Sequence, residues 1–528
     1  MKKRAILRVC CLALVLMLSI GLFAACKSEE PETSSTPSAT ESKGPQSEYQ
    51  DETGRYVAQT SGNTYNGATI TFLVCSVNNT YESEIVKNDY SLPDHAVEEG
   101  SRMLSTLNDA IGNRTDLVEE VLNVSIEEEF VFDTGGRPGG AMAQRIRNDG
   151  IAFTSDYQIV VPCLYDGAML SQENVLLDLN ALPGLQVNAP WWDQAFNKEM
   201  TIDGKLFFTI GDIGIGNKSS TAALTFNKDL YERYNLTEKY DGTPYDYVRK
   251  GTWTLDIAIQ MAKEFGEDIN SDGVIDYRDR VGWEGQLDDM WSLFYGAGSR
   301  IASSGDTASG YPELTMYSER NSNIMDKIQE LVLDKKHYVS ANDYFGVAQW
   351  PSVLTRDNFI AGNALFYNGS MSTPLELGDM EDDYGLLPIP KGDENQDDYN
   401  SLVNPWTSTC FAVPKWLPEE KREMIADVLD MMGAEGANAI APVYLEQCLE
   451  YMKSRDPDTT KEMIEKYILP GRSTDIGLVF RWGGLDTMLH DMATETNRGQ
   501  FTSTYQSKES AAQSALADTI EAFRTATD

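Results

Sequence analysis

The sequence predicts an α/β fold built on a largely parallel sheet, because apolar strands alternate with amphipathic helices. Three apolar stretches have the length and composition of strands, at residues 68–74, 124–132 and 157–161. Apolar residues recur at helical spacing over residues 102–121, between the first two strands, and a shorter helix is predicted at residues 142–147. This alternation is typical of parallel strands that are connected by helices.

Two residues with polar side-chain groups follow directly after the third strand. Tyr165 and Asp166 lie in the loop that succeeds YQIVV and Pro162. In sheets of this kind, ligands bind beyond the carboxyl ends of the strands. Tyr165 and Asp166 are therefore candidate ligand contacts, and the alternative is that they only support the loop.

The stretch from residue 190 to 230 contains the features of a connection between two lobes. Asp203-Gly204 is a hairpin turn signal between residues 201–202 and 205–210. A run with three glycines follows, and residues 222–226 then form a second apolar strand. Two strands separated by a glycine-rich segment can cross between lobes, and a few such residues can absorb a hinge motion. The alternative is a surface hairpin beside an ordinary strand.

Several motifs also occur in an order that resembles a known family. They are PWW (190–192), IDGKLFF (202–208), TFNKDLYERY (225–234), GTWT (251–254), FIAGNALFYNG (359–369), DYGLLPIPKGDENQDDY (383–399) and AVPKWLPEEKREMIADVLDMM (412–432). Together they resemble the extracellular solute-binding proteins of ABC importers, of the carbohydrate-binding type. The resemblance extends from about Tyr65 to the C-terminus. It implies a two-lobed, periplasmic-binding-protein-like fold of type II, with the ligand cleft between the lobes.

The resemblance also implies lobe boundaries and some of the ligand contacts. The first lobe is expected at residues 66–210 and 390–440, and the second at residues 211–389 and 441–528. Asn368 would face the cleft from the second lobe, and Asn404 and Trp406 match a loop that approaches the ligand in the family. Trp482 stands where the maltose-binding branch carries an aromatic residue that stacks on sugar.

Four further candidates rest on residue chemistry. Trp283, Asp288 and Trp291 follow one another closely, and Trp192 belongs to the PWW motif. Aromatic faces stack on the C–H faces of sugar rings, while carboxylates and amides bind the hydroxyls. For the tryptophans the alternative is a place in the core, since Trp291 and Tyr295 share one helical face.

The sharpest local motif is an acidic loop with the ligand spacing of a calcium site. Side-chain oxygens are available from Asp268, Asn270, Asp272, Asp276 and Asp279, at loop positions 1, 3, 5, 9 and 12. Gly273 stands at position 6, and Val274 would contribute its backbone carbonyl at position 7. Aspartate at position 12 resembles the dockerin variant of this loop. We expect one structural Ca²⁺ ion, and the alternative is an acidic turn without metal.

The N-terminus has the features of a lipoprotein signal peptide. Four cationic residues precede an apolar run that ends at Ala24-Ala25-Cys26. The run resembles a lipobox, although Phe23 replaces the usual aliphatic residue. Cys26 is then expected to carry fatty acids such as palmitate and to anchor the protein on the extracellular face of the cell membrane. Residues 27–65 are poor in large aliphatic residues, and we expect them to form a disordered tether.

The charge of the chain excludes some partners. Its net charge of −39 becomes −43 when the four cationic residues of the signal peptide are removed. Such acidity disfavours binding to nucleic acid and to anionic membrane surfaces. Outside the signal peptide, Cys75, Cys163, Cys410 and Cys448 are widely spaced, which favours isolated buried thiols over a metal or redox motif.

No catalytic motif supports an enzyme. The sequence lacks GxSxG, GxxxxGK[ST], HExxH and a complete GxGxxG, and its three histidines are scattered. The resemblance to solute-binding proteins implies a sugar ligand and an ABC permease as partners. Two alternatives remain open, which are a surface glycoside-processing enzyme and a calcium-stabilised adhesion or scaffold module. Turnover of an oligosaccharide panel would indicate the first, and a partner surface without a small-ligand cleft would indicate the second.

Lipidation at Cys26 is directly testable. We expect mass spectrometry of the mature protein to find a diacylated Cys26 at the N-terminus. Cys26→Ala should remain unprocessed or be released into the medium. An unmodified Cys26, or cleavage at another position, would contradict the predicted anchor.

Overall fold

A computed structural model of the 528-residue chain describes residues 48–76, 105–132, 138–153, 156–304, 307–452 and 454–527. The predicted signal peptide, Cys26 and the first part of the tether lie outside the described residues. No helix within those ranges is both long enough and apolar enough to span a bilayer.

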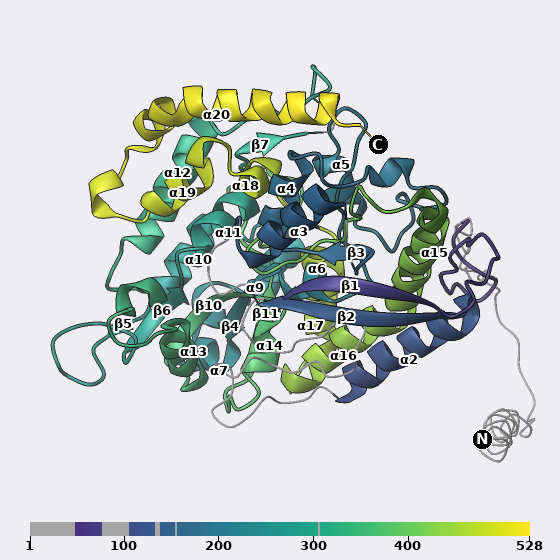
Figure 1. Ribbon diagram of the computed structural model, residues 1–528. Coiled ribbons are helices and arrows are strands. Elements are labelled where there is room, and N and C mark those ends of the chain that lie inside the picture. Colours follow the sequence, from purple (N-terminus) through teal and green to yellow (C-terminus); the bar gives the residue numbers. More distant parts are fainter. Residues whose placement is uncertain are drawn as a thin grey trace, which may run out of the picture. The chain divides into compact units, whose positions relative to one another are not determined.

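The first sheet is the parallel sheet that the sequence predicts. Its order is β2 (Val124–Phe132), β1 (Ala68–Ser76) and β3 (Ile159–Val161), with β1 parallel to both neighbours. Parallel neighbours need long crossovers, and α2 (Ser105–Leu122) and α3 (Ala141–Ala152) belong to these connections. The two helices lie on opposite sides of the strands (Figure 1).

The second sheet is mixed rather than largely parallel. Its order is β11 (Tyr384–Leu387), β4 (Ala222–Asn227), β10 (Ala364–Ser370), β6 (Arg280–Gly285) and β5 (Gly266–Glu267), and β9 (Tyr338–Ser340) also pairs with β6. β10 runs parallel to β6 but antiparallel to β4. β11 is antiparallel to β4, and β5 is antiparallel to β6. The parallel sheet predicted from the strands near residues 68–161 is confirmed by the first sheet.

The other elements connect, cover or link the two sheets. The helices are α4 (Leu164–Ser171), η2 (Leu179–Ala181), α5 (Gln194–Met200), α6 (Gly216–Ser219), α7 (Lys228–Arg233), α8 (Leu236–Lys239), α9 (Pro244–Lys250), α10 (Leu255–Ala262), α11 (Asp289–Gly296), α12 (Glu319–Val332), η3 (Ala341–Tyr344), α13 (Ser352–Ile360), α14 (Thr373–Glu376), α15 (Glu419–Glu435), η4 (Gly436–Ile440), α16 (Ala441–Met452), α17 (Pro457–Met463), η5 (Ile464–Ile468), α18 (Ile476–Phe480), η6 (Trp482–Gly484), α19 (Leu485–Asp491), η7 (Glu495–Asn497) and α20 (Phe501–Thr525). The short strands are β7 (Ala302–Ser303), β8 (Glu313–Leu314), β12 (Ser401–Leu402) and β13 (Arg472–Ser473).

The predicted hairpin after PWW is only a tight turn. Asp203 and Gly204 both have positive φ, as the Asp-Gly signal predicts, and Ile202 bridges Lys205. Residues 205–210 do not form a hairpin strand beside this turn. Instead, Thr209 bridges Phe411. The segment is therefore held by long-range pairing, which a local turn signal cannot indicate.

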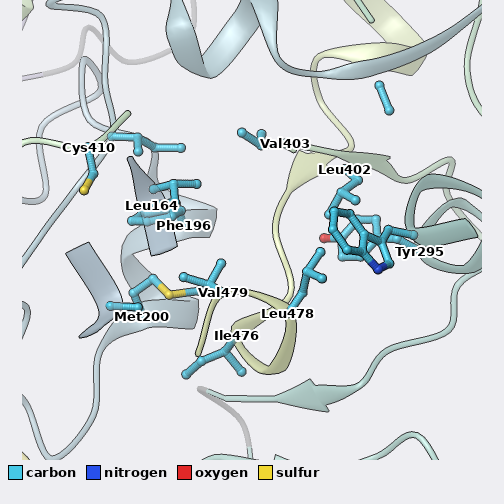
Figure 2. Packing of buried hydrophobic residues seen from close by; sticks show 14 of the residues in the cluster. Leu164, Phe196, Met200, Tyr295, Leu402, Val403, Cys410, Ile476, Leu478 and Val479 are labelled. Carbon is cyan, nitrogen blue, oxygen red and sulfur yellow. The ribbon is translucent and has the colours of Figure 1, made fainter. Parts of the chain in front are cut away.

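Between the two sheets lies a continuous apolar core. Figure 2 shows Ile476, Leu478 and Val479 of α18 between Met200 of α5 on one side and Leu402 of β12 on the other. All five side chains are buried and belong to one cluster that also includes residues of β1 and β4. The cysteines Cys75, Cys163, Cys410 and Cys448 are buried as well and form no disulfide, as expected.

Residues 48–66 are not part of a tether. Tyr49 packs edge-on against Trp191, and Asp427 of α15 accepts hydrogen bonds from Ser61 Oγ at 2.5 Å and from Tyr65 Oη at 2.5 Å. Burial and the bond to Asp427 raise the pKa of Tyr65 to about 12. The tether predicted for residues 27–65 is therefore too long, because three tyrosines and one alanine in its last part pack against the core cluster.

We predict that Asp427→Ala releases this segment. Losing the carboxylate leaves the partners of Asp427 unsatisfied, which should cost about 1–3 kcal/mol of unfolding free energy. Limited proteolysis should then cleave within residues 48–66 before the rest of the chain. Glu420→Ala, on the exposed first turn of the same helix, should cost under about 1 kcal/mol. Equal protease resistance of wild type and Asp427→Ala would contradict the assignment.

Candidate functional site

Two adjoining cavities form one cleft at the carboxyl ends of strands. The polar cavity has a volume of about 240 Å³ and the aromatic cavity about 400 Å³. Gln286, Asp288 and Ser352 line both cavities, which therefore adjoin one another. We call the combined space the cleft.

A buried aspartate organises the polar cavity. Asp289 at the start of α11 accepts hydrogen bonds from the Gln286 backbone N–H at 2.7 Å and from Asn368 Nδ2 at 2.5 Å. A Cβ on Gly285 would come within 1.9 Å of the Asp289 carboxylate, so glycine is required at the end of β6. Burial raises the pKa of Asp289 well above its ordinary value. The Asn368 Oδ1 atom is buried without a partner among the described residues, and it is available to a ligand donor.

Asp288 joins the polar cavity to the aromatic one. Its carboxylate accepts a hydrogen bond from Asn404 Nδ2 at 3.3 Å and lies 3.4 Å from His490 Nε2. Asn404 Oδ1 in turn accepts from the Trp406 backbone N–H at 2.9 Å. The loop after β12 is thereby tied to the loop after β6, and Asp288 keeps capacity to accept a bond from a ligand hydroxyl.

The aromatic cavity presents several ring faces to solvent. Trp350 is 58% exposed, Phe345 61% and Trp406 39%. Tyr165 packs edge-on against Trp406 with ring centroids 6.3 Å apart. Trp291 stacks on His490 at 4.1 Å. Exposed aromatic rings that line a cavity are unusual in a soluble protein and indicate a binding surface.

Ion pairs and hydrogen bonds fix the walls of the aromatic cavity. Arg481 Nε donates to Asp486 Oδ2 at 2.7 Å, and the Arg481 guanidinium lies 5.3 Å from the Tyr165 ring. The Trp291 indole N–H donates to the Asp486 carbonyl at 2.9 Å. Burial raises the pKa of Tyr165 well above its ordinary value, so its hydroxyl remains protonated and can donate.

Charge in the polar cavity is partly offset. Glu376 lies 4.0 Å from Arg356, and burial raises the pKa of Glu376. Both side chains line the cavity together with hydroxyls of Ser220, Ser372 and Thr373. The polar cavity therefore offers many hydrogen-bonding groups with little net charge.

Six of the nine predicted ligand contacts lie in this cleft. Asp288, Asn368 and Asn404 line the polar cavity, and Tyr165, Trp291 and Trp406 line the aromatic one. Asp166 does not line it, because its carboxylate accepts from the Gly139 N–H at 2.7 Å. The six residues that do line the cleft come from four chain segments that are far apart in the sequence.

The structure places Trp192, Trp283 and Trp482 in the core instead of the cleft. The Trp482 indole donates to Thr519 Oγ1 at 2.8 Å and stacks on Phe480, and the side chain is 2% exposed. Trp283 is fully buried in β6, and the Trp192 indole donates to Asp430. We therefore omit these three residues from the ligand site.

A kinked turn explains why Trp482 is buried beside a cleft residue. Arg481 has φ of 55°, and Gly483 and Gly484 also have positive φ. The left-handed residue before Trp482 redirects the chain, so Arg481 lines the cleft while the next side chain is buried. Gly483 is required here, because a Cβ would come within 2.5 Å of the Ala512 backbone nitrogen.

Sequence reasoning missed several cleft residues. Phe345 and Trp350 lie between η3 and α13, and Arg481, Asp486 and His490 come from the end of the chain. The available signal was an aromatic pair, Phe345 and Trp350, in a segment without strand or helix periodicity. Large aromatic residues outside any periodic pattern are not assigned to the core by that pattern, which makes them candidates for a binding surface.

The acidic loop brings three of its predicted ligands together. Carboxylate oxygens of Asp268, Asp272 and Asp279 lie within 4.8 Å of one another. Asp268 also accepts from the Gly273 N–H at 2.8 Å. Asp276 instead forms a bidentate ion pair with Arg278, which also bonds Asp272 at 2.8 Å.

The Asn270 side chain accepts from the Asp272 N–H at 2.8 Å, and Val274 is 60% exposed. The loop precedes β6, whereas the cleft residues Gln286 and Asp288 follow that strand, so the two sites lie at opposite ends of β6. Its geometry is therefore a question separate from ligand binding.

Of the comparisons with known proteins, only the comparison of three-dimensional structures finds similar proteins, and it supports the fold. No protein-family model and no curated protein matches the chain. Similar solved structures include the substrate-binding protein Lmo0181 from Listeria monocytogenes in complex with cycloalternan, with TM-score 0.51, 13% identity, and 87% of this chain and 98% of that chain covered.

Two further solved structures resemble this chain to a similar degree. One is the galacto-N-biose-/lacto-N-biose I-binding protein of an ABC transporter from Bifidobacterium longum, with TM-score 0.52, 11% identity, and 88% and 100% coverage. The other is UgpB from Mycobacterium tuberculosis in complex with glycerophosphocholine, with TM-score 0.52, 15% identity, and 79% and 96% coverage. The predicted two-lobed fold of the type II periplasmic-binding-protein-like class is confirmed.

We predict that Trp482→Ala destabilises the protein strongly. Removing a fully packed indole and leaving Thr519 without its donor should lower the free energy of unfolding by about 3–5 kcal/mol. Trp406→Ala should cost less than about 1.5 kcal/mol, because much of its ring is already solvated. Urea denaturation of the two variants measures the difference, and equal stabilities would contradict the core position of Trp482.

Proposed function

We propose that this protein is a lipid-anchored extracellular solute-binding protein that captures a sugar or oligosaccharide and delivers it to an ABC permease. One observation carries the proposal, which is the direct junction of exposed aromatic faces with a polar cavity through Asp288. The protein would act by binding and release, without chemical change of the ligand.

The two parts of the cleft match the two needs of a sugar. Sugar hydroxyls lose water on binding and must be compensated by hydrogen bonds, since an unpaired buried polar group is costly. Asn368, Asn404 and Asp288 offer such bonds. The C–H faces of the ring stack on aromatic side chains, and Phe345, Trp350 and Trp406 offer such faces. The two adjoining cavities together favour a ligand of at least two sugar units.

The structural relatives agree with this class without deciding it. Two of them are described with oligosaccharide ligands, whereas UgpB was solved with glycerophosphocholine. An aromatic cavity can also hold a quaternary ammonium group by cation–π attraction. The amide-rich polar cavity favours the sugar.

Hinge closure is the proposed mechanism. We propose lobes at residues 66–210 with 390–440 and at residues 211–389 with 441–528, each built around one sheet. The chain segments that cross near Thr221, Val403 and β13 pair with one another and would act as the hinge. α20 contacts both sides, since Lys205 bonds the Phe523 carbonyl at 2.6 Å and Tyr505 stacks on Tyr317.

We predict that Phe345→Ala, Trp350→Ala and Trp406→Ala each weaken sugar binding. The loss of one stacking face should cost about 1–2 kcal/mol, or roughly 5- to 30-fold in Kd. Phe153→Ala is the matched control, because Phe153 is 79% exposed and does not line the cleft. Calorimetry with mono- and oligosaccharides measures the effect.

The same titrations should include glycerophosphocholine. Binding of that compound with no heat from any sugar would overturn the sugar class and keep the cleft as the site. Equal sugar affinity for Phe153→Ala and all three cleft variants would remove the aromatic cavity from the site. Product formation from an oligosaccharide would instead indicate the glycoside-processing alternative.

We further propose that Asp268–Asp279 binds a structural Ca²⁺ ion. Ca²⁺ takes six to eight oxygen ligands, and the three converging carboxylates provide a strongly negative centre for it. Asn270, Asp276 and the Val274 carbonyl would complete the set. Arg278 competes with the ion for Asp272 and Asp276, so binding requires that side chain to move.

Calcium removal should lower thermal stability. We expect EDTA to reduce the melting temperature and added CaCl₂ to restore it, because an ion that binds only the folded state stabilises it by mass action. Asp272→Ala should abolish the difference, and Arg278→Gln should enlarge it by freeing two carboxylates. A metal-stripped protein whose melting curve is the same with and without calcium would rule the site out.

A further inference from the structure

A second and larger cavity lies apart from the cleft. Its volume is about 820 Å³, and it shares no lining residue with the polar or aromatic cavity. Residues of α5 and α9, Tyr295 of α11, and the segment before α18 line it. The β12–β13 ladder separates the two spaces, since Leu402 lines the cleft whereas its neighbours Arg472 and Ser473 line this cavity. We call it the basic cavity.

Positive charge gathers around the basic cavity in an otherwise acidic chain. The cationic side chains that line it are Lys198, Arg249, Lys250, Arg300, Lys466 and Arg472, and the acidic ones are Glu199, Asp397 and Asp398. The whole chain carries −39. A cavity with excess cations focuses a positive potential that attracts anions.

Arg300 is held in place with donors to spare. Its guanidinium lies 3.5 Å from the centroid of the Tyr295 ring, and Nη1 donates to the carbonyls of Tyr295 at 3.0 Å and Ser299 at 2.8 Å. Among the described residues, Glu199 and Asp475 interact with Arg300 electrostatically, but neither forms a close ion pair with it. A guanidinium has five N–H donors, so several remain for an anion.

Two other groups that line the cavity add to Arg300. Thr474 is 1% exposed, lines the cavity, and its hydroxyl has no hydrogen-bond partner among the described residues. A buried hydroxyl without a partner is costly, and a ligand oxygen would satisfy it. Lys250 lies at the rim and is exposed. By contrast, Arg249 pairs with Glu462 and Arg472 with Asp193.

We propose that the basic cavity is a second binding site, which takes a small organic molecule carrying a sulfate or phosphate group. Tetrahedral anions suit several convergent donors, and an arginine can bind two of their oxygens at once. The volume falls in the range of small-molecule sites and exceeds what a bare ion fills. The anionic group would lie between Arg300, Thr474 and Lys250.

The protonation state of Glu199 should make anion binding depend on pH. Burial, followed by repulsion from Asp475, raises the pKa of Glu199 to about 7, although Arg300 and the backbone N–H groups of Ser304 and Ile476 oppose this rise. The hydrogen bond to Glu462 raises the pKa of Arg249, which also lines the cavity. A charged Glu199 repels an anion bound beside Arg300. Protonation below pH 7 removes that repulsion, so anion affinity should rise as pH falls.

Sulfate is the probe, because it does not titrate between pH 6 and pH 8. Calorimetric titration of the full chain with sodium sulfate, at ionic strength held constant with sodium chloride, should show saturable binding. With one repelling group of pKa near 7, Kd should be about tenfold lower at pH 6 than at pH 8. Glu199→Gln should bind at pH 8 as tightly as wild type at pH 6 and lose the pH dependence.

Cation variants test the location. Arg300→Gln should abolish sulfate binding, and Lys250→Gln, an exposed change with little effect on folding, should weaken it severalfold. Lys421→Gln on α15 removes the same charge outside the cavity and should leave Kd unchanged. No saturable binding by wild type at pH 6 would overturn the site. Unchanged Kd in Lys250→Gln and in a folded Arg300→Gln would do the same.

A final arm tests the size of the ligand. Glucose 6-sulfate should bind the basic cavity more tightly than inorganic sulfate, because the sugar fills space that the ion leaves to water. Lys250→Gln should weaken both ligands, which separates this site from the cleft. A Kd for glucose 6-sulfate no lower than that for sulfate would contradict an organic ligand.

Discussion

The buried carboxyl group of Asp289 is the interaction on which the cleft depends. It ties the turn after β6 to the end of β10 through the Gln286 N–H and Asn368 Nδ2. Gly285 makes room for it, since any Cβ there would occupy the place of the carboxyl oxygen. Because Asp289 is fixed, Asp288 beside it is directed toward Asn404 and His490, and the aromatic cavity joins the polar one at that point.

The parts of the fold that follow local rules were predictable from the sequence. β2 occupies the predicted residues 124–132. Asn368 near the end of β10 and Asn404 after β12, which the family resemblance indicated, both line the cleft. The mixed pairing of β4 with β10 was not predictable, because strand direction depends on partners distant in the sequence. The tether was overestimated for the same reason, since residues 48–66 gain order from long-range contacts such as those with α15 and Trp191.

Tryptophan identity alone could not separate core from cleft. Trp482 and Trp406 have the same chemistry, yet one is 2% exposed and the other 39%. The difference arises from the left-handed turn at Arg481. No residue pattern predicts this turn, because arginine seldom adopts a left-handed backbone conformation. Trp350 and Phe345 were overlooked because they lie in an irregular segment. Their exposure becomes informative only once His490 and Trp406 are seen to face the same space.

The central claim is that sugar covers the exposed rings of the cleft. Of the nine tryptophans, Trp350 and Trp406 are the exposed ones, so they dominate quenching of tryptophan fluorescence by acrylamide. Acrylamide titration with and without a saturating oligosaccharide therefore measures coverage of these rings. The account predicts a clear fall in the quenching constant when the sugar is present. A sugar that binds by calorimetry yet leaves the quenching constant unchanged would contradict it.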